Sequence, residues 1–177
     1  PVLLAAASAE TGTDGLQYSY NNENLTATVS GYTGAATELV IPAEVTHEGE
    51  TYKVTAIGAE AFRGNSTLTK VTIPDGYTTI DGDSFKGCTS LTEINIPGSV
   101  TSVSYNAFEG CTSLSSVRFD TTTTADKLSI GMNAFKNCAL TSVALPERLS
   151  DVHGTSFVGN AALSTLEVES GSSAFAS

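Results

Sequence analysis

A short motif built around one phenylalanine recurs five times at nearly constant spacing, and this period limits what the chain can fold into. The motif phenylalanines are Phe62, Phe85, Phe108, Phe135 and Phe157, spaced by 23, 23, 27 and 22 residues. An aliphatic residue stands five positions before each phenylalanine, and a leucine follows each by five or six positions. A unit this short cannot bury its apolar side alone, whereas stacked copies can. The sequence therefore predicts a solenoid in which each copy forms one coil.

Each of these leucines opens a pattern that alternates with period two, as in LTKVTIP (68–74) and LTEINIP (91–97). Such alternation predicts a short strand with one buried face. Pro74, Pro97 and Pro146 follow three of the strands and end them, because proline has no N–H to donate. A second short β segment precedes each phenylalanine. We expect a mainly β solenoid with parallel strands on its concave face.

The residues around each phenylalanine predict one short helical or 3-10 turn on the convex side of each coil. Residues that favour helix N-caps stand two positions before four of the phenylalanines. These are Asp83, Asn106, Asn133 and Thr155. Residues that suit a left-handed stop stand two positions after each phenylalanine. These are Gly64, Gly87, Gly110, Asn137 and Gly159.

The three cysteines occupy one position of the repeat, which asparagine takes in the outer copies. The five residues of this position are Asn65, Cys88, Cys111, Cys138 and Asn160. Alternation with asparagine favours a structural ladder of small inward residues over a metal site, and buried free cysteine packs as a small hydrophobe. A Cys88–Cys111 disulfide stays open as an alternative, because stacked coils place equivalent Cα atoms about 4.8 Å apart. We expect no metal ligands and no cofactor.

The repeats do not extend over the whole chain. We expect residues 1–9, PVLLAAASA, to be the remnant of a signal peptide or a tag-like tail. The alternative is an ordinary apolar strand. Residues 10–56 predict an N-terminal β cap of two hairpins, and residues 57–168 form the repeats. Residues 169–177 are expected to be a truncated tail. The longest copy carries four extra residues around 120–129, expected as a solvated loop.

The charge balance excludes some classes of partner. The chain has 8 Lys and Arg against 19 Asp and Glu, a formal net charge of −11. Such a surface repels nucleic-acid phosphates and anionic lipids. The sequence contains no run of 18 apolar residues, so we expect no membrane span in this chain.

The hallmarks AF-x-G-C/N, TSL and V-x-IP, over about residues 37–168, resemble the leucine-rich repeats of the BspA type. This resemblance implies an exported or cell-surface protein of anaerobic bacteria, especially Bacteroidetes, or of some protists. It implies a role in adhesion to host proteins or other cells, and it carries no catalytic residues. The chain departs from the pattern at the 120–129 insertion and at Asp120, which replaces proline.

Variable side chains that point outward from the concave strands form the predicted binding face. They are Lys70, Thr72, Glu93, Asn95, Ser116, Arg118, Ser142, Thr165 and Glu167. We expect a secreted or cell-surface module that binds a host or bacterial surface protein. The alternative is a glycan-binding accessory domain of a bacterial surface system. We expect Tyr77 and Tyr105 to be exposed aromatic residues. Asp151, His153 and Ser156 resemble a catalytic triad only weakly, so the sequence does not predict an enzyme.

Overall fold

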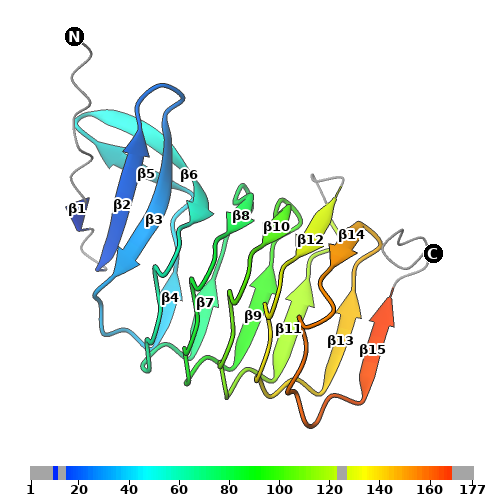
Figure 1. Ribbon diagram of the computed structural model, residues 1–177. Helices are drawn as coiled ribbons and strands as arrows, with labels where there is room; N and C mark the ends of the chain where they lie inside the picture. Colours follow the sequence, from blue (N-terminus) through cyan, green and yellow to red (C-terminus); the bar gives the residue numbers. More distant parts are fainter. Residues whose placement is uncertain (1–9, 12–14, 123–126, 169–177) are drawn as a thin grey trace.

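The computed structural model describes residues 10–11, 15–122 and 127–168. The predicted signal remnant (1–9) and tail (169–177) lie outside the described residues. The described chain forms fifteen strands wound into stacked coils, with no helix among these residues (Figure 1). None of it therefore offers a helix long and apolar enough to cross a membrane.

The strands predicted at the end of each repeat form one side of the solenoid. They are β4 (Glu38–Val40), β7 (Lys70–Thr72), β9 (Glu93–Ile96), β11 (Ser116–Phe119), β13 (Ser142–Leu145) and β15 (Thr165–Val168). The first four pair in parallel in the order β11-β9-β7-β4, and β13 pairs in parallel with β15. The predicted leucine-rich-repeat solenoid with parallel strands is confirmed.

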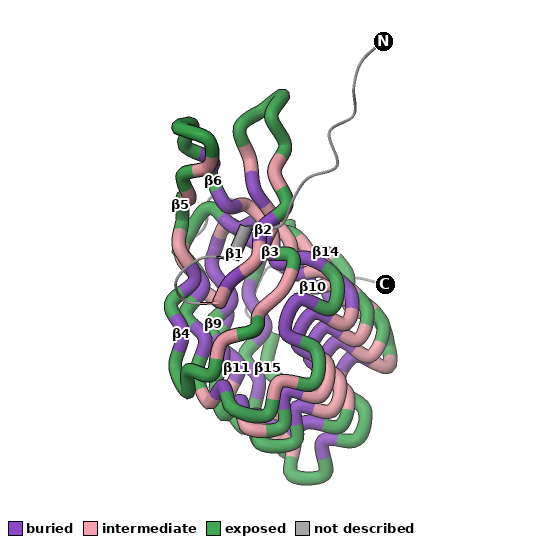
Figure 2. Tube along the Cα trace, turned by 90° about the vertical axis from the view of Figure 1, so that its left-hand side faces the viewer, coloured by how far each residue is buried: buried purple, intermediate pink, exposed green. Residues whose placement is uncertain are grey.

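The second predicted β segment of each coil forms a longer sheet. Its parallel strands are β8 (Thr79–Ile80), β10 (Ser102–Val103), β12 (Leu128–Ile130) and β14 (Leu149–Val152). They continue from β6 (Glu50–Ile57), and the sheet order is β1-β2-β3-β6-β8-β10-β12-β14. Each coil therefore contributes one strand to each side of the solenoid, and the buried residues alternate with exposed ones along the coils (Figure 2).

Two hairpins precede the repeats. Strands β2 (Leu16–Asn21) and β3 (Thr26–Tyr32) are antiparallel, and β1 (Glu10–Thr11) pairs with β2. Strand β5 (Glu44–His47) is antiparallel to β6, and the turn between them uses left-handed φ angles of 52° at Glu48 and 86° at Gly49. The Tyr32 ring lies 5.4 Å from the ring of Phe62, the first motif phenylalanine. We propose that residues 10–56 act as the N-terminal cap.

The five motif phenylalanines stack on one another along the solenoid, and we call this series the Phe ladder. Neighbouring ring centroids are 4.7, 5.0, 5.1 and 5.4 Å apart, and neighbouring planes lie within 3° of parallel. This spacing is close to the distance of about 4.8 Å between hydrogen-bonded strands. Equivalent side chains in hydrogen-bonded coils therefore reach stacking distance when they share one rotamer.

The turn that carries each phenylalanine is not a capped helix, so this part of the prediction is wrong. The residue two positions before the phenylalanine has a left-handed φ in four coils: 61° at Glu60, 57° at Asp83, 54° at Asn106 and 58° at Asn133. A helix N-cap requires an extended φ instead. Asp and Asn tolerate the left-handed region, so the same residue types serve both structures. Thr155, which is β-branched, has no such φ.

The cysteine position turns inward and bonds to the backbone of the preceding coil. Cys88, Cys111 and Cys138 are free and buried. Their Sγ atoms lie 3.1, 3.1 and 3.2 Å from the carbonyl oxygens of the phenylalanines one coil earlier. The Asn160 amide donates to the Phe135 carbonyl at 2.8 Å in the same way. Asn65 is half-buried, and its side chain accepts the Leu68 N–H within its own turn.

The row of hydrogen-bonded strands on one side of the solenoid is interrupted after β11. Strands β11 and β13 belong to separate sheets, and residues 123–126 of the insertion lie outside the described residues. Arg148 reaches back from the following coil: its guanidinium donates to the Val100 carbonyl at 2.5 Å and to the Pro97 carbonyl at 3.2 Å. These carbonyls lie two coils earlier, so a buried arginine bridges the coil that carries the insertion.

Removal of one ring from the middle of the Phe ladder should destabilise the whole stack. We expect Phe108→Ala to lower the free energy of unfolding by roughly 3–5 kcal/mol, because the fully buried ring leaves a cavity between two others. A denaturant melt measures this loss. The exposed neighbour Thr112→Ala is the matched control and should shift stability by about 0.5 kcal/mol or less. Equal stability of the two variants would contradict the ladder.

The cysteines should be unreactive in the folded protein and all accessible after unfolding. Burial raises the pKa of the Cys138 thiol to about 12, so little nucleophilic thiolate exists near neutral pH. A thiol reagent should react slowly with the native protein and titrate three thiols in denaturant without reductant. A titre of one thiol would instead reveal a disulfide.

Candidate functional site

The outward side chains of β7, β9 and β11 form a polar surface, which we call the strand face. Each strand alternates buried and outward residues, because successive side chains of a strand point to opposite sides. The parallel register places Lys70 beside Glu93 and Glu93 beside Ser116. Asn95 lies beside Arg118 in the same register. Residues 23 positions apart in the sequence therefore become immediate neighbours.

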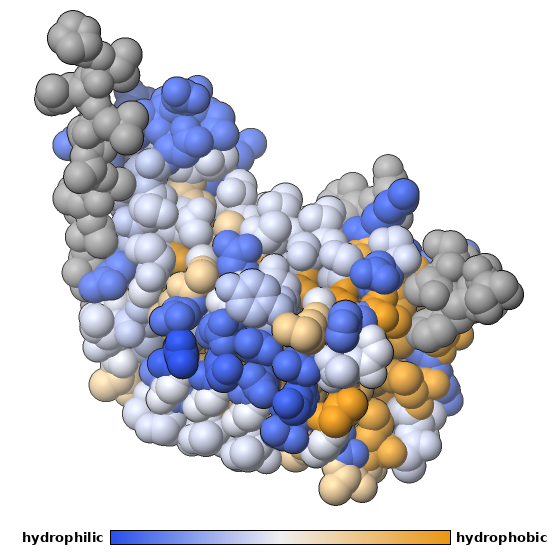
Figure 3. All heavy atoms as spheres, viewed as in Figure 1, coloured by the Kyte–Doolittle hydropathy of each residue, from blue (hydrophilic) through white to orange (hydrophobic). Residues whose placement is uncertain are grey.

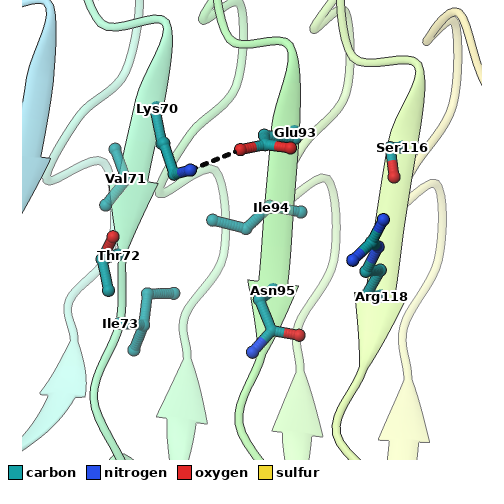
Figure 4. A pocket seen from close by; sticks show the side chains of 9 residues that line it. All are labelled: Lys70, Val71, Thr72, Ile73, Glu93, Ile94, Asn95, Ser116 and Arg118. Atoms are coloured by element: carbon teal, nitrogen blue, oxygen red, sulfur yellow. Dashed lines mark ion pairs between the residues drawn. The ribbon is translucent and has the colours of Figure 1, made fainter.

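The strand face is hollowed at its centre. The hollow measures about 380 Å³, and Figure 4 shows its lining from three neighbouring strands. Six of the nine sequence-predicted binding residues line it: Lys70, Thr72, Glu93, Asn95, Ser116 and Arg118. Val71, Ile73 and Ile94 complete the lining. Sequence patterning marks these three only as core residues, because the hollow beside them forms only when the three strands lie side by side.

An ion pair occupies one side of the hollow. The Lys70 ammonium lies 2.7 Å from a Glu93 carboxylate oxygen, and both side chains are about half exposed, at 48% and 49%. The hydrogen bond and the charge attraction raise the pKa of Lys70. The same contacts lower the pKa of Glu93, with a smaller contribution from the Arg118 charge. Both groups are therefore ionised at neutral pH, and the hollow is open to solvent.

Arg118 supplies a positive charge without a fixed partner on the other side of the hollow. Its side chain is exposed, and no described carboxylate forms an ion pair with it. In Figure 4 it lies beside Ser116, across from the Lys70–Glu93 pair. A guanidinium presents a planar fork of N–H groups that matches a carboxylate. The hollow can thus recognise a polar or acidic group through the Arg118 guanidinium, the Asn95 amide and the hydroxyls of Thr72 and Ser116.

The remaining three predicted binding residues lie elsewhere on the solenoid. Ser142 belongs to β13, whereas Thr165 and Glu167 belong to β15, and these two strands form the separate sheet beyond the insertion. None of the three lines the hollow. The row of hydrogen-bonded strands that carries the hollow stops at β11, so these three residues lie beyond its end.

Three other residues singled out in the sequence can be placed in the structure. Tyr77 is fully buried, and its hydroxyl donates to the Pro42 carbonyl at 2.9 Å, so it is no exposed aromatic. Tyr105 is 51% exposed, as expected. Ser156 donates its hydroxyl to the carbonyls of Gly131 and His153, at 2.9 and 2.6 Å. Its hydroxyl is therefore directed to backbone oxygens.

Several solved structures with a similar fold come from bacteria. A leucine-rich repeat protein from Bacteroides ovatus is 30% identical, with a TM-score of 0.79 over 88% of this chain and 40% of its own. A leucine rich cell surface protein from Faecalibacterium prausnitzii is 26% identical, with a TM-score of 0.52 over 93% of this chain and 55% of its own. The Treponema pallidum leucine rich repeat protein, at 24% identity and a TM-score of 0.71, shares the fold. The chain spans about half or less of the first two proteins.

Family membership follows from the repeats themselves. No curated protein matches this sequence. The pattern of the BspA type leucine rich repeat region matches in six copies, over residues 50–164 and 121–177. Solenoids of this kind typically serve as binding scaffolds, and the repeat fold indicates a surface for protein interactions. The chain belongs to the BspA-type leucine-rich-repeat family.

Proposed function

We propose that this chain is a secreted or cell-surface adhesion module that binds a host or bacterial surface protein through its strand face. The observation that carries the proposal is Arg118, an exposed guanidinium without a fixed carboxylate partner at the rim of the hollow. Arginine is enriched among the residues that dominate protein interfaces. The centre of recognition would therefore be the guanidinium and the polar groups around it.

The charge pattern favours a protein ligand that presents an acidic side chain. Lys70 and Glu93 already neutralise each other at 2.7 Å, so they offer an incoming group little net charge. Arg118 keeps its full charge for a ligand carboxylate, while Asn95 and Ser116 lie beside it for further hydrogen bonds. The Lys70–Glu93 pair would then disfavour the binding of a basic or misplaced ligand, because either ligand would have to break the ion pair.

The openness of the hollow supports a macromolecular ligand. Small-molecule sites are enclosed and mainly apolar, and they bury most of their ligand. Here the two charged side chains at the centre are about half exposed. A protein loop can cover such a surface and exclude water from it.

The proposed location rests on the relatives. The Faecalibacterium prausnitzii protein, which is 26% identical to this chain over the aligned part, is a leucine rich cell surface protein. The formal net charge of −11 agrees with a role away from nucleic acid. A glycan-binding accessory domain remains the alternative, favoured by the amide and hydroxyl groups around the hollow.

Reversal of the Arg118 charge should weaken recognition without unfolding the protein. We expect Arg118→Glu to weaken binding by about tenfold or more to any protein that binds the wild type on an array of purified host extracellular proteins. Lys53→Glu, an equal charge change on the exposed face of β6, is the matched control and should bind as the wild type does. Surface plasmon resonance measures both, and circular dichroism verifies the fold.

The same experiment separates the alternatives. Equal affinity of Arg118→Glu and the wild type would show that the strand face is not the site. Ligands found only on a parallel glycan array would favour the glycan-binding function instead.

A further inference from the structure

Outward side chains of the strand face and of β4 form two rows that run across the strands. The parallel register of β4, β7, β9 and β11 aligns equivalent residues, about 4.8 Å from one strand to the next (Figure 1). One row, which we call the charged row, contains Glu38, Lys70, Glu93 and Ser116. The other, which we call the Val40 row, contains Val40, Thr72, Asn95 and Arg118.

The Val40 row is apolar at one end and cationic at the other. Val40 is 70% exposed, more than any other large hydrophobic residue that the structure describes. Figure 3 shows hydrophobic residues gathered toward the C-terminal end of the molecule, whereas β4 is the first strand of its sheet in the chain. The next strands carry Thr72 and Asn95 at the equivalent position, so the repeat itself does not require an apolar residue at Val40. Arg118, exposed and without an ion pair to a described carboxylate, ends the row.

The charged row limits where an acidic ligand can lie. It holds two carboxylates, Glu38 and Glu93, against the single ammonium of Lys70. That ammonium already lies 2.7 Å from the Glu93 carboxylate. A further carboxylate over this row would therefore meet more repulsion than attraction. The Arg118 end of the Val40 row is the favourable position for it.

The length of the Val40 row matches an extended chain. Three strand spacings separate Val40 from Arg118, or about 14 Å. An extended chain advances about 3.4 Å per residue and its side chains alternate, so residues i and i+4 point the same way about 14 Å apart. An α-helix fits less well, because residues on one of its faces lie about 10.5 Å (i+7) or about 16.5 Å (i+11) apart. Residue i+2 of an extended chain would lie between Thr72 and Asn95, whose hydroxyl and amide can bond to a polar side chain.

We propose that an extended segment of the partner protein crosses the strands along the Val40 row. Its recognition pattern is an apolar residue at position i, a polar residue at i+2 and an aspartate or glutamate at i+4. The apolar side chain covers Val40, and the carboxylate binds the planar fork of N–H groups of Arg118. This inference rests on the proposed function and adds to it the conformation of the ligand and the spacing of its side chains.

Synthetic peptides of threonine and serine, each with one leucine and one glutamate, test the proposal by NMR titration of the isotope-labelled chain. The leucine and the glutamate stand three, four or five positions apart, in both orders, and threonine favours the extended conformation. We expect a peptide with the spacing of four to bind about fivefold or more tightly than those with the other spacings. At odd spacings one of the two side chains points away from the protein. The amides of β4 and β11 should shift together when the matched peptide binds.

Variants at the two ends of the row separate the two contacts. Val40→Thr keeps the β-branched shape but removes apolar surface, so it should weaken the matched peptide by about threefold. The same change at Val158, which is 50% exposed on a motif turn, is the control and should leave binding unchanged. Arg118→Glu should weaken the matched peptide by about tenfold or more. Lysine in place of the peptide glutamate should restore binding to this variant.

Three outcomes would overturn the inference. They are equal binding at every spacing, equal binding of the matched peptide to the wild type and Val40→Thr, and no binding of any peptide at millimolar concentrations. Each of them leaves the proposed function standing. The proposed function fails instead when Arg118→Glu keeps full affinity for the protein ligand.

Discussion

The hydrogen bonds between successive turns are the constraint on which the rest of the structure depends. Each of the first four motif phenylalanines donates its N–H to the carbonyl just before the next phenylalanine, at 2.7 or 2.8 Å. This bond fixes the register of neighbouring coils and brings equivalent rings to stacking distance. The coil with the insertion obeys the same rule: Phe108 and Phe135 are 27 residues apart, yet their rings lie 5.1 Å apart. The additional residues are accommodated between the strands, away from the turn.

This constraint acts on the inward positions of each coil and leaves the outward positions free to vary. Inward positions repeat the same residue types because every coil must fit the one before it. Outward positions on the strands carry no such requirement, so Lys70, Glu93 and Ser116 occupy one aligned row with different chemistry. A binding surface can therefore change residue by residue while the scaffold stays the same.

The sequence predicts the period, both sets of strands and the two hairpins, because each depends on local alternation and spacing. It misreads the turns, since Asp83 and Asn106 favour a left-handed φ as well as a helix N-cap. Long-range contacts escape it as well. Tyr77 is buried, and its hydroxyl donates to the Pro42 carbonyl, 35 residues away, while Arg148 reaches back across the coil with the insertion. Local patterns carry no signal for either contact.

A double-mutant cycle on the Phe ladder tests the central claim that neighbouring coils stabilise each other through their stacked phenylalanines. Conservative Phe→Leu substitutions keep the core filled while removing the ring. We expect Phe85→Leu and Phe108→Leu, whose rings are 5.0 Å apart, to show a coupling energy of about 0.5–1.5 kcal/mol. Phe62→Leu and Phe135→Leu, separated by two intervening rings, should add to within about 0.5 kcal/mol. Additive neighbours, or equal coupling in both pairs, would contradict this account.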